Sequence, residues 1–282
     1  MKYWQRIRKE RTDLTDYIIH WTKGKNEGGK WTKPFDTLLK IIECGYLVAT
    51  FAKKSSIYDR TGRPTVRGPY PSVCFTEQSL DSFALSCNIL PTHYKPYGIA
   101  LYKRALYKYG GRPVIYHSEE ILGQMLMPNE KGYKAGQEIF KNGLPDKYQY
   151  LWVRYEPIPN EDGYVVDWTH EREWRSKVEI IHDIELGVTP DEGVPILLPA
   201  IYDSDKGKHI RYLPKILVST IDEKEIVIEM IRILSPDWSA KSNNKYLQGY
   251  FKLLPKVNVI ALGELNEQPE AHNLEWIIPD TN

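Results

Sequence analysis

The 282-residue chain lacks the features of secreted, disulfide-stabilised and membrane-spanning proteins. Its three cysteines, Cys44, Cys74 and Cys87, are odd in number and form no Cys-x-x-Cys motif. No apolar run approaches the roughly 20 residues that cross a bilayer. The charged N-terminus also lacks the apolar core of a signal peptide. These absences predict a cytoplasmic protein with no disulfide framework, no zinc site and no membrane partner.

The chain also lacks an excess of charge and the common nucleotide-binding motifs. Because 38 basic residues nearly balance 37 acidic ones, no global field marks a nucleic-acid-binding protein, and only a local basic patch stays open. The absence of Gly-x-Gly-x-x-Gly and of Gly-Lys-Ser/Thr argues against a Rossmann fold and a P-loop enzyme. No Gly-x-Ser-x-Gly elbow marks a hydrolase.

What is present is enough apolar material for one sizeable core, at 41% of residues. Short apolar runs and helix-period segments alternate without repeats, which predicts one α+β domain at 1–235 with a C-terminal extension at 236–282 packed on it. Predicted strands cover 17–22, 46–50, 72–77, 97–102, 113–116, 148–156, 171–175, 178–184, 195–199, 215–219 and 253–262. Predicted helices cover 1–13, 34–47, 79–88, 103–109, 118–142 and 222–233, with Gly45 as a natural stop.

The most unusual stretch is 167–175, which reads DWTHEREWR. If its last five residues form a strand, Glu171 and Glu173 share one face of it. Two carboxylates side by side repel each other, which favours a site that presents an acid to a sugar. The alternative is a solvated strand face on which Arg172 and Arg175 neutralise the acids.

Two basic segments are candidates for contacts with phosphate groups. Residues 52–72 hold no periodic pattern but carry Arg60, Arg63 and Arg67, and a loop of about 20 residues in a compact domain is usually functional. A guanidinium grips a diphosphate bidentately, so these arginines are predicted to bind anions. Arg8 lies on a basic N-terminal helix. For each of these arginines a solvated surface charge is the alternative.

The order of these pieces resembles the ADP-ribosyltransferase superfamily. The segments IIHWT, LLKIIECGYL, VCFTE, YGIALYK, GGRPVIY and EREWR follow one another over about residues 17–235. As a set they are similar to DarT-type nucleic-acid ADP-ribosyltransferases and to AbiGi-type abortive-infection proteins. The resemblance implies a split mixed β-sheet core with flanking helices, and NAD⁺ as co-substrate without a metal.

The resemblance assigns the acids and the loop arginine to catalysis. It implies that Glu173 binds the ribose and stabilises the oxocarbenium-like charge left when nicotinamide departs. Glu171 would orient the nucleophile or accept its proton, and an exchange of roles between the two acids stays open. Arg60 would contact the NAD⁺ phosphates or the reacting base, with Arg63 and Arg67 as rivals.

The resemblance also implies which residues bind NAD⁺. His20 and Thr22 would contact the adenosine ribose, since an imidazole can donate or accept with either nitrogen. Tyr116 would stack on nicotinamide, with Phe75 and Thr76 bordering the same cleft. His20 and Tyr116 should then line one cleft with the ribose-binding glutamate. An ordinary structural role in a strand or core is the alternative for each.

A bacterial toxin or phage-defence effector that ADP-ribosylates a DNA or RNA base is the function that the resemblance implies. The acceptor would be single-stranded or flipped, because a base must reach C1′ of the ribose. Arg8, Arg63 and Arg67 are the candidate nucleic-acid contacts, and an antitoxin partner would protect the host.

Several alternatives stay open at this point. The acceptor could be a protein side chain. The chain could be a non-catalytic binding or regulatory module, an NAD⁺ hydrolase or a phosphotransferase on the same fold. A metal nuclease using His170, Glu171 and Glu173 is disfavoured, because His-x-x-x-His spacing and a second acidic cluster are missing.

Overall fold

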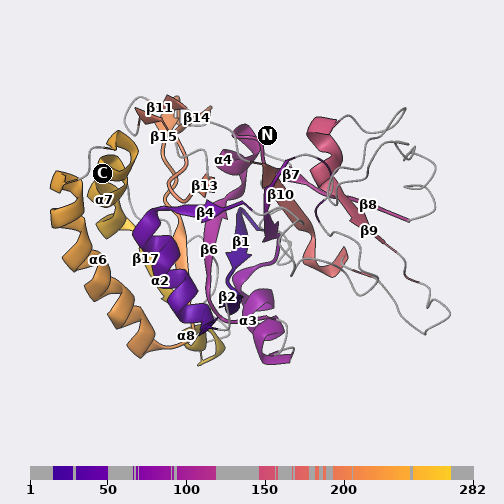
Figure 1. The fold of residues 1–282 in the computed structure, drawn as a ribbon, viewed down its shortest axis with the longest axis horizontal. Coiled ribbons are helices and arrows are strands. Elements are labelled where there is room, and N and C mark those ends of the chain that lie inside the picture. The colour runs from indigo at the N-terminus through magenta and orange to yellow at the C-terminus, as the bar shows by residue number, and fades with distance from the viewer. Residues whose placement is uncertain are drawn as a thin grey trace.

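The computed structural model shows a mixed α+β fold built on one seven-stranded sheet, in the order β17-β16-β6-β1-β5-β10-β7 (Figure 1). It describes residues 15–27, 30–49, 66, 68, 70–89, 91, 94–118, 146–155, 157, 167, 169–177, 182–183, 187–188, 193–204, 206–241 and 244–267. The strands of this sheet are β1 (Tyr17–Trp21), β5 (Ser72–Thr76), β6 (Gly98–Tyr102), β7 (Arg112–Pro113), β10 (Glu173–Lys177), β16 (Lys215–Val218) and β17 (Asn258–Ala261). Neighbouring strands are antiparallel except for β16 and β17, which are parallel.

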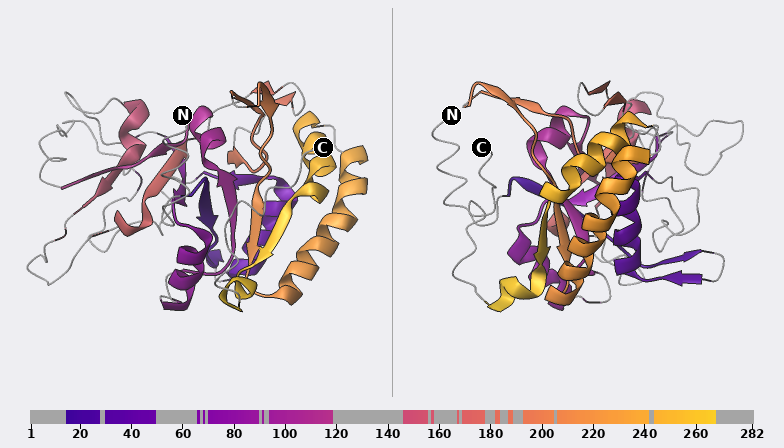
Figure 2. Two further views of the ribbon diagram at one scale, coloured as in Figure 1. Left: turned by 180° about the vertical axis from the view of Figure 1, so that it is seen from behind. Right: turned by 90° about the vertical axis from the view of Figure 1, so that its left-hand side faces the viewer.

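Helices cover both faces of this sheet, as the views in Figure 2 also show. They are α2 (Pro34–Cys44), α3 (Leu80–Ile89), α4 (Lys103–Lys108), α6 (Ile221–Lys241), α7 (Lys245–Leu253) and α8 (Leu262–Glu267). Because strand side chains alternate, Ile18 packs with α2, α6 and α7 on one face, and Ile19 packs with α3 and α8 on the other. The predicted α+β class, with a mixed sheet and flanking helices, is confirmed.

Shorter elements surround the sheet. The described residues also form five small sheets of two strands each. They are β2 (Lys25–Glu27) with β3 (Lys30–Thr32), β4 (Tyr46–Val48) with β13 (Gly193–Pro195), β8 (Ile115–His117) with β9 (Trp152–Arg154), β11 (His182–Asp183) with β12 (Gly187–Val188), and β14 (Ile201–Asp203) with β15 (Lys208–Ile210). The 3₁₀ helices are η1 (Asp146–Leu151), η2 (Thr169–Glu171) and η3 (Leu254–Lys256). The strand predicted at 148–156 is therefore wrong over its first half, where η1 lies.

Helix α2 illustrates how local signals set an element. Pro34 occupies its first turn, and Gly45 ends it with φ +81° and donates its N–H to the Ile41 carbonyl at 2.9 Å. Two carbonyls at its end accept hydroxyl hydrogen bonds from α7. Tyr250 donates to Ile42 O and Tyr246 to Gly45 O, both at 2.6 Å. The helix therefore ends at Cys44 instead of residue 47.

Residues 244–267 form more helix and strand than the polar sequence there predicts. Residues 236–249 hold the end of α6 and the start of α7, and Tyr246, Tyr250 and Phe251 are fully buried in the main core. The predicted strand at 253–262 is η3 followed by β17. Residue 235, the predicted end of the domain, lies inside α6, and core residues continue to Leu265. The predicted helices at 1–13 and 118–142 lie outside the described residues.

Candidate functional site

A 3₁₀ turn and a strand present the two glutamates, so the prediction of one strand over 171–175 is wrong. Glu171 ends η2, and β10 begins at Glu173. Between them Arg172 has φ 45°, a left-handed conformation that breaks strand alternation. The turn is fixed to the end of β5, because the Glu171 carbonyl accepts hydrogen bonds from Thr76 Oγ1 at 2.6 Å and from the Glu77 N–H at 3.0 Å.

Both carboxylates nevertheless converge on the same surroundings. Lys23, Cys74 and Tyr116 each respond to the charge of Glu171 and to that of Glu173. Burial is the largest influence on the pKa of Cys74 and on that of Tyr116 and raises both, and the two carboxylates raise them further. Two acids, one ammonium and one phenol therefore meet beside the ends of β5 and β10.

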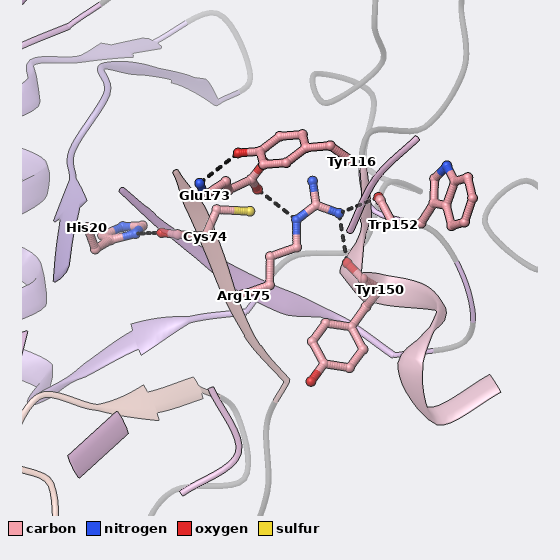
Figure 3. A network of polar contacts seen from close by, with 7 residues as sticks. All are labelled: His20, Cys74, Tyr116, Tyr150, Trp152, Glu173 and Arg175. Carbon is pink, nitrogen blue, oxygen red and sulfur yellow. Dashed lines mark hydrogen bonds and ion pairs between the residues drawn. The ribbon is translucent and has the colours of Figure 1, made fainter. Parts of the chain in front are cut away.

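Arg175 holds Glu173 in a buried network, shown in Figure 3. Its Nε donates to Glu173 Oε1 at 2.7 Å, and the two side chains are only 3% and 11% exposed. Its Nη1 donates to the backbone carbonyls of Tyr150, at 2.7 Å, and Trp152, at 3.1 Å. Burial alone would lower the pKa of Arg175, but the adjacent carboxylate raises it overall, so the guanidinium stays charged.

Two more groups border Glu173. The Tyr116 hydroxyl, from β8, accepts the Glu173 N–H at 2.7 Å. Cys74 lies opposite Arg175 in the sheet, and burial, followed by the charge of Glu173, raises the pKa of its thiol to about 12. Cys74 is therefore a neutral thiol near pH 7 and not an activated nucleophile.

Glu171 has partners that differ from those of Glu173. The buried Tyr94 donates its hydroxyl to Glu171 Oε1 at 2.9 Å, and the same hydroxyl lies 3.1 Å from His170 Nε2. Lys23 is exposed and lies over the Trp21 ring, 4.1 Å from its centroid. The site can therefore offer carboxylates to a cationic sugar and an ammonium to an anion.

The predicted adenosine-ribose residue His20 borders this cluster: burial lowers its pKa, the contact with the Cys74 carbonyl opposes this, and the charge of Lys23 lowers it further. His20 faces Phe75 with ring centroids 5.9 Å apart, and His20 Nδ1 is 2.9 Å from the Cys74 carbonyl oxygen. In the sheet, Ile19 and not His20 lies opposite Thr76, and Thr76 lies opposite Glu173. Because strand side chains alternate, His20 and Glu173 leave opposite faces of the sheet. That His20, Tyr116 and Glu173 line one cleft stays a prediction.

The remaining predicted residues have structural contacts. Thr22 is 2% exposed and donates its hydroxyl to the Pro34 carbonyl at 3.0 Å, which ties β1 to the start of α2. Phe75 is a core residue, and the buried Thr76 hydroxyl is bonded to η2. The predicted arginines Arg8, Arg60, Arg63 and Arg67 lie outside the described residues.

A cavity of about 270 Å³ lies between α3 and the start of α8, not over the carboxylates. It is lined by Ala84, Cys87, Asn88, Pro91, Tyr94, Lys95, Pro96, Ser219, Leu262 and Gly263. Within the described part of the chain, no three His, Cys, Asp or Glu side chains are grouped to hold a metal ion. None of the helices described there is both long and apolar enough to span a bilayer.

The sequence did not predict three residues that contact the two glutamates or respond to their charge: Lys23, Tyr94 and Arg175. For Arg175 a signal existed, since it is two residues from Glu173 and so shares its strand face. Lys23 and Tyr94 join the cluster only through tertiary contacts. Comparisons with protein-family models, with curated proteins and with solved structures find no match to this chain.

Proposed function

We propose that the protein is an NAD⁺-consuming ADP-ribosyltransferase in which Glu173 binds the ribose of NAD⁺. The observation that carries the proposal is that Glu173, which is largely buried and paired with Arg175 at 2.7 Å, lies beside the Tyr116 hydroxyl, while Glu171 ends the turn that leads into the same strand. Like charges gathered in a desolvated place reduce stability, and such arrangements cluster at functional sites. Loss of nicotinamide leaves a cationic ribose, which two nearby carboxylates would stabilise.

Each group has a role in this proposal. Arg175 holds the Glu173 carboxylate in place through the 2.7 Å ion pair. Glu171 accepts the proton of the nucleophile. The Lys23 ammonium attracts the anionic part of NAD⁺, and the Tyr116 ring lies beside the departing nicotinamide. A nucleic-acid acceptor, an antitoxin partner and a toxin or phage-defence role rest on the family resemblance alone.

A second candidate is a non-catalytic binding module of the same fold. Two observations favour it. His20 leaves the opposite sheet face from Glu173, and the acid is already paired with a buried arginine that also binds two backbone carbonyls. An ion pair of this kind would serve to join β10 to the segment around Trp152 without any chemistry.

One experiment separates these functions. The protein is incubated with NAD⁺ labelled at the adenylate phosphate, alone and with single-stranded DNA, RNA or cell lysate, and compared with Glu173→Gln and Glu171→Gln. Glu229→Gln is the matched control, because Glu229 pairs with Arg232 on the exposed surface of α6. Transfer that is lost in Glu173→Gln and kept in the control supports the proposal. Free ADP-ribose without transfer indicates a hydrolase. An absence of NAD⁺ turnover in every mixture supports the non-catalytic binding module.

A further inference from the structure

A chain of three side chains links Glu171 to the protein surface. His170 Nε2 lies 3.1 Å from the Tyr94 hydroxyl, which donates to Glu171 Oε1 at 2.9 Å. Tyr94 is 1% exposed, whereas His170 is exposed. The buried phenol therefore connects a carboxylate of the site to an imidazole in contact with solvent.

The surrounding residues hold this chain in place. The Tyr94 ring packs 5.2 Å from Trp21 and 6.3 Å from Phe83, measured between ring centroids. The turn that carries His170 and Glu171 is fixed by hydrogen bonds from Thr76 and Gln78. The ring and the turn are thus both anchored, and only the hydroxyl proton needs to rotate.

We infer that Tyr94 and His170 relay a proton between Glu171 and solvent. The inference rests on the proposed function, in which Glu171 takes the proton of the nucleophile as the bond to C1′ forms. The new O–H bond of Glu171 then breaks as its proton passes to the Tyr94 oxygen, while the Tyr94 hydroxyl proton passes to His170 Nε2. These two transfers leave a carboxylate, a neutral phenol and a protonated imidazole, and the imidazole then releases a proton to water.

The environment of Tyr94 suits a relay that never rests as a phenolate. Burial, followed by the charge of Glu171, raises the pKa of Tyr94 well above its ordinary value. The phenol gains one proton as it loses another, so no buried negative charge forms on it. Tyr94 and His170 act through Glu171, and neither is assigned a contact with NAD⁺.

The test compares Tyr94→Phe and His170→Ala with Tyr97→Phe. Tyr97 is a matched control, because its hydroxyl also donates to a carboxylate, Glu223 Oε1 at 2.8 Å, but on α6. We expect Tyr94→Phe to lower kcat for transfer by about 10², with KM for NAD⁺ changed less than about twofold, and to alter the solvent deuterium isotope effect. Imidazole should restore His170→Ala, while Tyr97→Phe keeps the wild-type rate.

Other outcomes overturn the relay in distinguishable ways. A wild-type rate in Tyr94→Phe, or a folded His170→Ala that is slow and gains nothing from imidazole, leaves Tyr94 as a clamp for the turn. Either result leaves the proposed function standing if the wild-type protein transfers ADP-ribose. A wild-type protein that turns over no NAD⁺ overturns the proposed function itself and the relay with it. Thermal unfolding of each variant separates these results from loss of the fold.

Discussion

Replacing Arg175 by methionine would keep an unbranched side chain at this buried position but remove its charge and its donors. Glu173, only 11% exposed, would lose its cation, and the carbonyls of Tyr150 and Trp152 would lose a donor. Breaking a buried ion pair from one side lowers the free energy of unfolding by about 3–5 kcal/mol.

Urea unfolding followed by tryptophan fluorescence would measure this change, with the midpoint falling and the slope unchanged. Arg232→Met is the matched control, because Arg232 makes an ion pair of the same 2.7 Å length with Glu229, but with side chains 76% and 51% exposed. We expect no measurable change there. The double variant Arg175→Met/Glu173→Gln should recover part of the loss, since no buried charge is left unpaired. An Arg175→Met midpoint equal to that of the wild type would refute the reasoning.

Three further predictions follow from burial and hydrogen bonding. Burial lowers the pKa of Lys215 from 10.5 to about 8. Between these two pH values the unfolded chain binds more protons than the folded one, so the free energy of unfolding should rise with pH. Urea titrations at pH 7.5, 9 and 10 would measure this rise, which Lys215→Met should abolish. With its thiol pKa at about 12, Cys74 should resist iodoacetamide at pH 8 in the native protein and react in urea, as mass spectrometry of peptides would show. Tyr246→Phe removes the donor to the buried Gly45 carbonyl and should lower the free energy of unfolding by about 1–3 kcal/mol, whereas an unchanged thermal midpoint would contradict this.

Elements with strong local signals could be predicted from the sequence. Strand β1 is a short apolar run, and α2 combines helical spacing with Pro34 in its first turn and Gly45 at its end. Helix α3 begins as predicted, with Ser79 Oγ accepting the Ser82 N–H at 3.2 Å. In these cases residues that lie within a few positions of one another determine the conformation.

The rest depends on contacts between distant segments. Helix α7 was predicted only as part of a polar extension, because its buried tyrosines find hydroxyl partners at the end of α2 and not nearby in sequence. The turn before β10 depends on Thr76, 95 residues from Glu171. One residue at positive φ, Arg172, then changes which side chains share a face. The strand geometry that was expected to bring the two acids together is therefore wrong.

The capping of α2 by α7 has a consequence for biosynthesis. The donor hydroxyl of Tyr246 lies 201 residues after the Gly45 carbonyl that it satisfies. The same carbonyl also accepts the Ile196 N–H at 3.0 Å. At a translation rate of about 5–20 residues per second, roughly 10–40 seconds pass between the synthesis of Gly45 and that of Tyr246. The main core, which contains residues of both helices, is therefore completed only after α7 has been made. Nascent chains exposed to a protease should thus stay sensitive around residue 45 until the α7 tyrosines have left the exit tunnel.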